Sequence, residues 1–497
     1  VDSLVVAGIG FEVEHCNPGP GGGPTLRVRE LSSGRELLRF DCFEDSPHWH
    51  LDPGEGDEIS HLESAGDPIG EVLGMLAEDL SALLSRMAPE SSRLDAKEFS
   101  EGLEVLESQL RNPPVDFESV RAEQRRPSVG EKWSRYPEDV LPLWVADMDF
   151  PVAEPIRRVL HRALAGSDLG YPIHPGPTGL RELAVERMRE RFGWEAEVSR
   201  VEVITDVVQG MYLALLGCTQ PGDGVVVQTP VYPPFLACVE ETGRRRIDAP
   251  LVVGPGGYEV DLDALRDAVD ADTRALLLCN PHNPSGRAFR REELQGIAEL
   301  AVERDLVVIS DEIHGDLVYS GHRHRPIASL GREIAERTIT LTAASKAFNI
   351  AGLRCAVVIF GSRDLQQKFA TLPRHARGGI GVPGIEALLA AWQHAQPWLD
   401  AAVAHLEANR DAVFSRLKTD FPAVVAYPPE ATYLGWLDCR GLEIEGSPYE
   451  FFLREAKVAL SDGAAFGPPG RGFVRINFAT SSAIVSEALD RMAEALA

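Results

Sequence analysis

A lysine, Lys346, stands in the segment "LTAASKAFNIAGLR", residues 341–354. The residues just before it, ending at Ser345, are small or hydroxylated, so they leave room around the amine. An arginine, Arg354, closes the segment. A lysine amine can act as a covalent nucleophile or as a base when its surroundings suit that role. We therefore expect the amine of Lys346 to contact something larger than a side chain.

Three other polar or aromatic residues follow apolar runs in a similar way. Asp311 ends the run in "VVISDEIHGD", Asn283 lies in "CNPHNPSG", and Tyr232 lies in "TPVYPPF". Each has a plain structural reading: a helix cap or ion pair for Asp311, turn chemistry for Asn283 and core packing for Tyr232. A buried carboxylate is nevertheless costly without a cationic partner, so Asp311 indicates that a cation lies beside it.

Taken together with Lys346, these residues indicate a planar heteroaromatic cofactor. Tyr232 would stack on its ring, Asp311 would pair with a protonated ring nitrogen, and Asn283 would hold a ring hydroxyl. Lys346 would form an imine with an aldehyde on the ring. Arg354, Ser345 and a helix N-terminus would bind a phosphate group.

The elements that would position these residues begin near residue 117. Short apolar runs such as "VEVIT", "GVVVQTP", "LVVISDEI" and "CAVVIFG" alternate with helical stretches such as "REELQGIAELAVERD". This alternation is typical of a largely parallel sheet with helices on both faces. Sheets of this kind place their functional residues at the carboxyl ends of the strands, where the polar residues described above are expected.

Residues 1–112 have a different pattern. Alternating apolar and polar residues in "DSLVVAGIGFEVEH", "TLRVREL" and "RELLRFDCFED" predict half-buried strands, and residues 67–87 have helical periodicity. We therefore predict a small α+β module with a linker near residues 111–116. His48 and His50 would share one face of a strand, with Cys42 nearby. These three could bind a metal, but we favour a solvated or interface face and predict no metal site.

Composition excludes several classes of protein. The chain has 497 residues, enough for two or three domains. Its net charge of −27 argues against a nucleic-acid partner, and no apolar run of about 18 residues predicts a membrane span. Seven scattered cysteines without a CxxC pair indicate reduced thiols and a cytoplasmic protein. Because the first residue is Val1, we expect the chain to be part of a longer protein.

Several long motifs in residues 117–497 resemble those of the fold-type I pyridoxal 5'-phosphate (PLP) enzymes, and within them the MalY/PatB group of C–S β-lyases. They are "EKWSRYPEDVLPLWVADMDFPVAEPI", "SDEIHGDLVY", "SKAFNIAGL", "ATYLGWLD" and "GRGFVRINFA". The resemblance implies a mostly parallel seven-stranded sheet with helices on both faces. It also implies a large domain over about 160–385 and a small α+β domain over about 117–159 and 386–497, preceded by the module of residues 1–112.

The resemblance also implies roles for single residues. Lys346 would be the catalytic Schiff-base lysine, Asp311 the partner of the ring nitrogen and Tyr232 the stacking residue. The other implied roles are Asn283 and His314 near the ring hydroxyl, Arg475 with the backbone near Ala146 on the substrate carboxylate, and Tyr171 reaching the cofactor of the second subunit of a homodimer with shared active sites.

Two positions depart from the pattern of this group. Relatives usually carry Gly or Ser at the position of Val207, so the backbone N–H groups of Val207 and Val208 would have to bind the phosphate. Many lyases lack an arginine at the position of Arg354, where this sequence looks like an aminotransferase. Arg354 therefore supports phosphate binding but leaves the reaction type open.

The implied reaction is β-elimination. Cysteine, thiocysteine or an S-substituted cysteine would give a thiol or persulfide, pyruvate and ammonia. Two alternatives stay open: a class I/II aminotransferase, and a non-catalytic PLP-binding regulatory or docking module. The order of the two parts also resembles leinamycin-type polyketide synthases, in which a domain of unknown function precedes a cysteine lyase domain. That context would make a carrier-protein-bound cysteine adduct the substrate.

Overall fold

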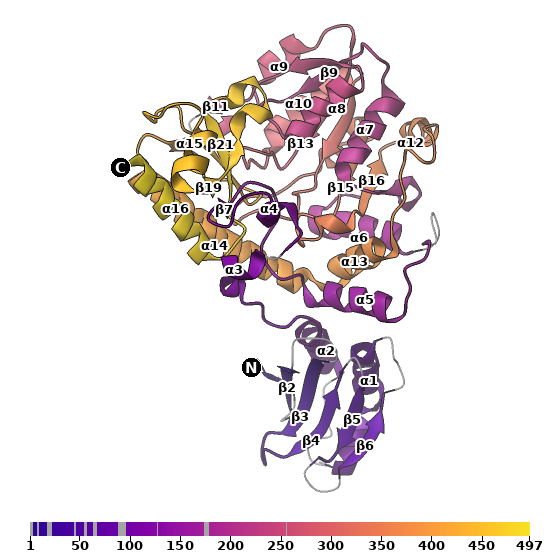
Figure 1. Ribbon diagram of the computed structural model, residues 1–497. Helices are drawn as coiled ribbons and strands as arrows, with labels where there is room; N and C mark the ends of the chain where they lie inside the picture. Colours follow the sequence, from indigo (N-terminus) through magenta and orange to yellow (C-terminus); the bar gives the residue numbers. More distant parts are fainter. Residues whose placement is uncertain are drawn as a thin grey trace. The chain divides into compact units, whose positions relative to one another are not determined.

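The chain folds as two compact units, which are described separately (Figure 1). The first contains Val1–Val115, Ala153–Asp168 and Gln393–Trp398, and the second contains Asp116–Val152, Leu169–Trp392 and Leu399–Ala497. The computed structural model describes residues 3–6, 9–16, 22–43, 46–53, 57–62, 67–87, 96–126, 128–172, 178–254 and 256–497.

The first unit contains an antiparallel sheet whose strands follow one another in chain order. Within the described residues these strands are β1 (Ser3–Val6), β2 (Ile9–Cys16), β3 (Gly23–Glu30), β4 (Glu36–Asp41), β5 (His48–Leu51) and β6 (Glu58–His61). The segment expected to be one strand over residues 2–15 is a pair, β1 and β2, joined in antiparallel register. The Gly/Pro turn expected at residues 17–24 lies mostly outside the described residues.

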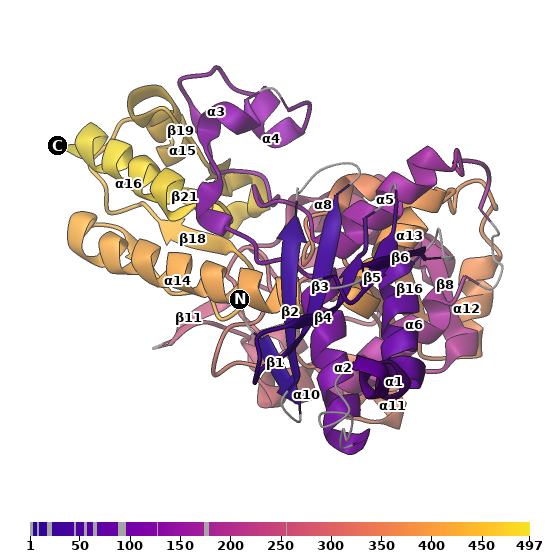
Figure 2. The same ribbon diagram turned by 90° about the horizontal axis from the view of Figure 1, so that it is seen from below.

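Two helices, α1 (Pro68–Met87) and α2 (Ala96–Arg111), pack on one face of this sheet (Figures 1 and 2). Alternation along the strands explains which face they cover. Leu38 and Phe40 of β4 enter the core with Leu76 of α1, while Arg39, between Leu38 and Phe40, lies on the polar face. The predicted α+β character of this region is confirmed.

The second unit is built on a mixed sheet, seven-stranded in the described part of the chain. Its order is β10 (Arg245–Asp248), β9 (Gly224–Val227), β13 (Thr273–Cys279), β14 (Val307–Asp311), β15 (Thr338–Thr342), β16 (Ala356–Phe360) and β8 (Val201–Ile204). The strands from β10 to β15 are parallel, whereas β16 pairs antiparallel with both β15 and β8. The predicted mostly parallel sheet is confirmed.

Helices cover both faces of this sheet, because successive residues of each strand enter different cores. Leu277 and Ile309 pack in the core with α7 (Val207–Cys218), α8 (Pro233–Glu241) and α12 (Arg363–Ala370). Leu276 and Val308 pack in the other core with α9 (Leu262–Ala268) and α10 (Arg291–Glu303). Apolar side chains on both faces of a strand produce the continuous apolar runs of the sequence.

A second, four-stranded sheet in the described residues has the order β17 (Val425–Ala426), β18 (Leu434–Asp438), β21 (Phe473–Asn477) and β20 (Ser461–Asp462). A short parallel pair joins β7 (Leu141–Pro142) to β19 (Val458–Ala459). This pairing brings the segment after β7 beside the C-terminal part of the chain.

The remaining elements connect these sheets. They are α3 (Ala122–Arg125), α4 (Glu131–Ser134), α5 (Glu154–Ala165), α6 (Leu180–Phe192), β11 (Val252–Gly254), β12 (Gly257–Glu259), α11 (Arg332–Ala335), α13 (Val382–His394), α14 (Gln396–Asp420), α15 (Pro448–Phe451) and α16 (Ser482–Leu496), with short 3-10 or π turns between some of them. Among the residues described, none of the helices combines the length and apolar character that crossing a membrane requires.

Candidate active site

Lys346 lies just beyond the end of β15, at the carboxyl edge of the main sheet. Its Nζ atom donates a hydrogen bond to the backbone oxygen of Ala146 at 2.7 Å and stands 3.8 Å from Oδ1 of Asp147. Burial lowers the pKa of the Lys346 amine, while the carboxylates of Asp147 and Asp311 partly oppose that shift. A lowered pKa increases the share of neutral amine, which is the form that attacks carbonyl groups and accepts protons.

Asp311 is the last residue of β14, and its carboxylate accepts a hydrogen bond from the backbone N–H of Ile313 at 3.0 Å. Burial raises the pKa of this carboxyl to about 7, and the neighbouring Glu312 adds to the shift, which Lys346 partly opposes. No cationic side chain in the described part of the chain forms an ion pair with it. The cation that the sequence predicts for Asp311 must therefore come from a bound group.

Glu312 points away from the site and is satisfied by its own partners. Ser310 donates to its Oε1 atom at 2.8 Å, and Nε2 of His324 lies 3.0 Å from its Oε2 atom. These groups are buried beneath the end of β14. Glu312 is therefore fully engaged by protein groups. The carboxylate of Asp311 accepts from the N–H of Ile313 and remains available to a ligand.

Arg475, in the middle of β21, is buried and connects several parts of the site. Its Nη1 atom donates to Oδ1 of Asn283 at 2.9 Å, and Nη2 donates to the backbone oxygen of Trp144 at 2.9 Å and to Oγ of Ser461 at 3.1 Å. Burial lowers the pKa of the guanidinium to about 10, so it remains charged at neutral pH. Because the oxygen of Asn283 is engaged by Arg475, the NH₂ group of that amide is the part left to donate to a ligand.

Tyr232 and His314 supply the flat groups of the site. Tyr232 caps the start of α8, and its backbone N–H donates to the backbone oxygen of Asn283 at 3.0 Å, so the two predicted residues are joined directly. Burial raises the pKa of the Tyr232 hydroxyl. Burial lowers the pKa of His314 to about 3, so its ring is neutral, and it meets the ring of Tyr433 edge-on at 6.0 Å.

Three of the residues predicted to bind a phosphate lie at the N-terminus of α7. Val207 and Val208 are the first two residues of this helix, and their N–H groups belong to the set that has no partner within a helix. Asp206 caps the helix by accepting from the N–H of Gln209 at 2.8 Å, and its Oδ2 atom pairs with Nη2 of Arg354 at 2.7 Å. Arg354 therefore reaches the correct helix end, although 63% of its side chain is exposed.

The other predicted residues have different positions. Ser345 is half-buried next to Lys346, and its backbone oxygen accepts from the N–H of Ile350 at 3.0 Å. The backbone oxygen of Ala146 contacts Lys346, as noted above. The side chain of Tyr171 is fully exposed, so within one chain it does not join the cluster. Its predicted contact with a second subunit remains a prediction.

Sequence reasoning gave no role to several residues that hold the segment after β7. Tyr433 donates to the backbone oxygen of Ala146 at 2.8 Å, and the side-chain amide of Asn477 donates to the backbone oxygens of Val145 at 2.6 Å and Asp147 at 2.7 Å. These residues lie inside motifs that the sequence identifies, "ATYLGWLD" and "FVRINF". Their role becomes visible only when the two distant segments are seen side by side.

The residues present fit a PLP-like cofactor. Asp311 is a buried acid whose pKa is raised, Nδ1 of His314 and Nε of Arg475 are buried without a hydrogen-bond partner among the described residues, and α7 offers free N–H groups. Buried polar atoms normally find partners, so these groups mark a place for a ligand. A flat ring with a cationic nitrogen and an anionic tail matches their arrangement.

Comparison with known proteins agrees with this geometry. Residues 138–492 match the family model "Aminotransferase class I and II", and residues 4–110 match a domain of unknown function, DUF7700. Cystathionine beta-lyase PatB of Bacillus subtilis is 37% identical over 384 residues, covering 76% of this chain and 99% of PatB. A cystathionine beta-lyase of Corynebacterium glutamicum is 37% identical over 370 residues, covering 73% of this chain and 96% of that enzyme.

Among solved structures, the PLP-bound C–S lyase of Staphylococcus hominis superimposes with a TM-score of 0.72 at 28% identity, covering 77% of this chain and 98% of that one. The match to PatB leaves about a quarter of this chain uncovered, and the aminotransferase family model begins at residue 138, after the N-terminal sheet. The chain therefore belongs to the aminotransferase class I and II family and, within it, to the MalY/PatB-like cystathionine beta-lyases.

Proposed function

We propose that this protein is a PLP-dependent C–S β-lyase acting on cysteine, thiocysteine or an S-substituted cysteine. The products are a thiol or persulfide, pyruvate and ammonia. The observation that carries the proposal is that Lys346, an amine whose pKa burial lowers, lies at the same sheet edge as Asp311, a buried carboxyl without an ion pair among the described residues. The similarity to cystathionine beta-lyases supports elimination rather than another fate of the amino acid.

Each part of the cofactor has a proposed partner. Lys346 binds its aldehyde carbon, Asp311 its ring nitrogen and Tyr232 its ring face. The amide of Asn283 and the ring of His314 serve the ring hydroxyl, and the phosphate lies at the N–H groups of Val207 and Val208 with Ser345 and Arg354. When bound, PLP supplies an electron sink for the carbon that loses its proton.

The side chains of the protein perform the remaining steps. Arg475, with the backbone near Ala146, binds the α-carboxylate of the substrate, because a guanidinium fork matches a carboxylate. The amino group of the substrate would first replace Lys346 on the aldehyde carbon, and the freed amine of Lys346 would then accept the α-proton as a general base. The electron pair of the breaking C–S bond leaves with sulfur, and a thiolate is a stable leaving group.

We also propose that the enzyme works as a homodimer with shared active sites. Tyr171 supports this proposal because its large aromatic side chain is fully exposed within one chain. A second subunit would bury this ring against the cofactor. Mixed dimers with Tyr171→Phe in one subunit and Lys346→Ala in the other test the sharing. They keep one intact site only if each site takes its lysine from one subunit and its tyrosine from the other.

The reaction is tested by incubating the purified protein with L-cystathionine, L-cystine and S-alkylcysteines and following pyruvate. Stoichiometric pyruvate and thiol, with the cofactor returned to its starting absorbance, is the expected result. A keto acid that retains sulfur, together with an aminated cofactor, would show an aminotransferase, the alternative that Arg354 favours. Cofactor binding without either product would show the non-catalytic module.

The N-terminal module leads to a finer proposal about the substrate. The cystathionine beta-lyases match nearly their whole length without it, so free amino acids do not require it. We propose that the substrate is a cysteine adduct linked to a carrier protein. The test compares kcat/KM for a carrier-linked S-alkylcysteine with kcat/KM for the free amino acid. Equal values would remove the carrier from the proposal and leave the lyase reaction intact.

A further inference from the structure

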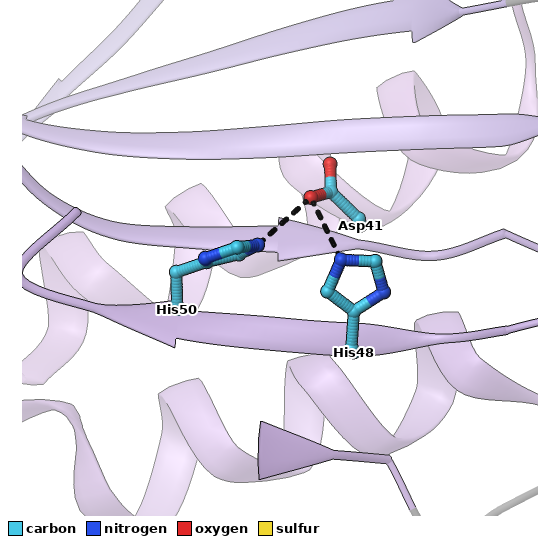
Figure 3. Close-up of side chains that lie close together, drawn as sticks. All are labelled: Asp41, His48 and His50. Atoms are coloured by element: carbon cyan, nitrogen blue, oxygen red, sulfur yellow. Dashed lines mark ion pairs between the residues drawn. The ribbon is translucent and has the colours of Figure 1, made fainter. Parts of the chain in front are cut away.

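Three polar side chains gather on the open face of the N-terminal sheet, outside the lyase site. Asp41 ends β4, and His48 and His50 lie on β5. The two strands are antiparallel, with Asp41 opposite His48 and Arg39 opposite His50. Strand alternation places all of them on the face away from α1 and α2. Figure 3 shows the carboxylate directed toward both imidazole rings.

The distances suit a metal ion. Oδ2 of Asp41 stands 3.5 Å from Nε2 of His48 and 3.5 Å from Nε2 of His50 (Figure 3). All three ligand atoms lie within 4.8 Å of one another. Ligands placed ~2.0–2.1 Å from zinc at tetrahedral angles stand about 3.3 Å apart. Two of the three pairs are close to this spacing, and the third pair, the two Nε2 atoms, is also within 4.8 Å.

Each imidazole ring is oriented by a hydrogen-bond partner at its Nδ1 atom. Nδ1 of His48 lies 2.8 Å from the backbone oxygen of Ser46, and Nδ1 of His50 lies 2.6 Å from Oδ1 of Asp57. A carbonyl or carboxylate oxygen can only accept, so each Nδ1 carries a proton, and Nε2 is the ring atom left to ligate a metal ion. Partners that orient ligand histidines in this way are typical of metal sites. Thr25 donates to Oδ1 of Asp41 at 2.6 Å and orients the carboxylate similarly.

The guanidinium of Arg39 contacts the same ligand atoms. Its Nε atom donates to Oδ2 of Asp41 at 3.1 Å, and its Nη2 atom donates to Nε2 of His50 at 2.8 Å. The guanidinium of Arg39 therefore already contacts two of the three atoms that would bind a metal ion. Arg39 has a second carboxylate within reach, since its Nη1 atom stands 3.9 Å from Oε1 of Glu36. A metal ion could therefore displace Arg39 without leaving its charge unpaired.

The cysteine next to the cluster is not part of it. Cys42 packs in the apolar core under the helices, and burial raises the pKa of its thiol to about 12. A buried, protonated thiol is a poor metal ligand. Asp41, which precedes Cys42, is therefore the third candidate ligand in place of the thiol. Of the solvated or interface face expected for the two histidines, the solvated alternative does not hold for His50, because only 4% of it is exposed.

We propose that Asp41, His48 and His50 bind one divalent first-row transition metal ion, Zn²⁺ above all, with a fourth position open to water or an anionic ligand. Three protein ligands of the imidazole and carboxylate type with one open position are the arrangement of reactive rather than closed structural zinc sites. The site belongs to the N-terminal module and is independent of the lyase reaction.

Zinc binding to the full-length, metal-stripped protein tests the proposal. We expect one Zn²⁺ per chain by equilibrium dialysis, with a rise in unfolding temperature. Cobalt in place of zinc should give intense visible absorption bands of a four-coordinate ion. His48→Ala, His50→Ala and Asp41→Asn should each weaken binding by about 10²-fold or more, and Asp57→Ala by ~10-fold through the orientation of His50.

Two further variants make the result specific. Arg39→Ala removes the competing guanidinium but keeps all three ligands, so we expect tighter zinc binding, and Cys42→Ala should bind zinc as the parent protein does. Circular dichroism confirms that each variant is folded. The proposal is overturned if the parent protein binds no zinc, if folded His48→Ala and Asp41→Asn bind it equally well, or if only Cys42→Ala loses it.

Discussion

The edge of the main sheet and the open face of the N-terminal sheet both carry many polar side chains, but they satisfy them differently. On the N-terminal sheet the charges pair with each other: Arg27 and Arg29 each reach Glu36 at 3.0 Å, and Arg35 reaches Asp52 at 2.6 Å. On the main sheet, the buried carboxylate of Asp311 has a hydrogen bond from a backbone N–H but forms no ion pair among the described residues.

This difference separates a polar surface from a ligand site. In a partly exposed ion pair the two charges neutralise each other and need no further partner. A buried polar group without a partner costs free energy until a ligand supplies that partner. The cluster of Asp41, His48 and His50 lies between these two cases, because its lone pairs converge but Arg39 occupies part of their space. The variants below are chosen to break or sharpen this comparison.

Lys346→Ala should have the largest effect. We expect pyruvate release to fall by at least ~10²–10⁴-fold, because the variant loses the group proposed as general base. The measurement is the rate of pyruvate formation from L-cystathionine. Lys368→Ala is the matched control, since Lys368 pairs with Asp364 on α12, outside the site. Full elimination by the Lys346→Ala variant would contradict the proposed mechanism.

Arg475→Lys should follow. Lysine keeps the charge but cannot hold Asn283, Trp144 and Ser461 together, so we expect kcat/KM to fall by about 10–10²-fold, mainly through KM. Steady-state kinetics with the same substrate measures this change. Arg471→Lys, an exposed arginine near the start of β21, serves as the control. A fall confined to kcat would mean that Arg475 acts on the chemical step instead.

Asp311→Asn tests how a buried carboxyl without an ion pair changes the free energy of unfolding with pH. Without cofactor, the pKa of Asp311 is about 7 in the folded protein and near 3.8 when unfolded. The folded state thus holds the proton between these values while the unfolded state releases it. The stability of the parent protein should therefore fall as pH rises from about 4 to 7, by up to ~1.4 kcal/mol per pH unit from this group.

The Asp311→Asn variant does not titrate at this position, so it should lose less stability over the same pH range. Thermal unfolding midpoints of cofactor-free protein at pH 5 and pH 8 measure the difference. Asp263→Asn is the control, because that carboxylate is 99% exposed. Parallel pH curves for the parent protein and the Asp311→Asn variant would show that Asp311 is already ionised at low pH.

Arg354→Ala should have a modest effect. Exposed ion pairs contribute only ~0.2–1 kcal/mol, so losing Arg354 should weaken PLP binding by about 2–5-fold. Titration of cofactor-free protein with PLP, followed by absorbance, gives the dissociation constant. A loss above about 100-fold would exceed what an exposed pair contributes and would show that Arg354 turns inward and holds the bound phosphate directly.

Arg35→Ala should have the smallest effect. Its pair with Asp52 is partly exposed, so we expect a loss of stability of less than ~1 kcal/mol and no change in lyase activity. Thermal unfolding and pyruvate assays measure the two quantities. A large loss of stability would mean that the N-terminal sheet depends on its ion pairs as strongly as the edge of the main sheet depends on partners for its buried groups.

Three residues of the candidate site could be predicted to lie near one another because each ends or follows an apolar strand, and the ends of parallel strands converge. They are Lys346 after β15, Asp311 at the end of β14 and Asn283 after β13. Strand β10 escaped prediction because its sequence, "RRID", is charged. An edge strand has one neighbour and some exposure, so it needs no apolar run.

Contacts across sheets and between distant segments could not be predicted. The partnership of Asp41 with His48 depends on which residues of β4 and β5 stand opposite each other, and sequence spacing does not give that register. The same holds for Arg354 and Asp206, which are far apart in the chain and meet only because the fold brings both to the start of α7. Residue types indicate chemistry, but register and topology select the partners.

Residues 144–147, after β7, share one kind of anchor, their main-chain carbonyl groups. The carbonyl oxygens of Trp144, Val145, Ala146 and Asp147 each accept hydrogen bonds from side chains elsewhere: Arg475, Ser461, Asn477, Tyr433 and Lys346. Any amino acid supplies the same carbonyl group. A change of side chain at position 145 would therefore leave all of these carbonyl anchors in place.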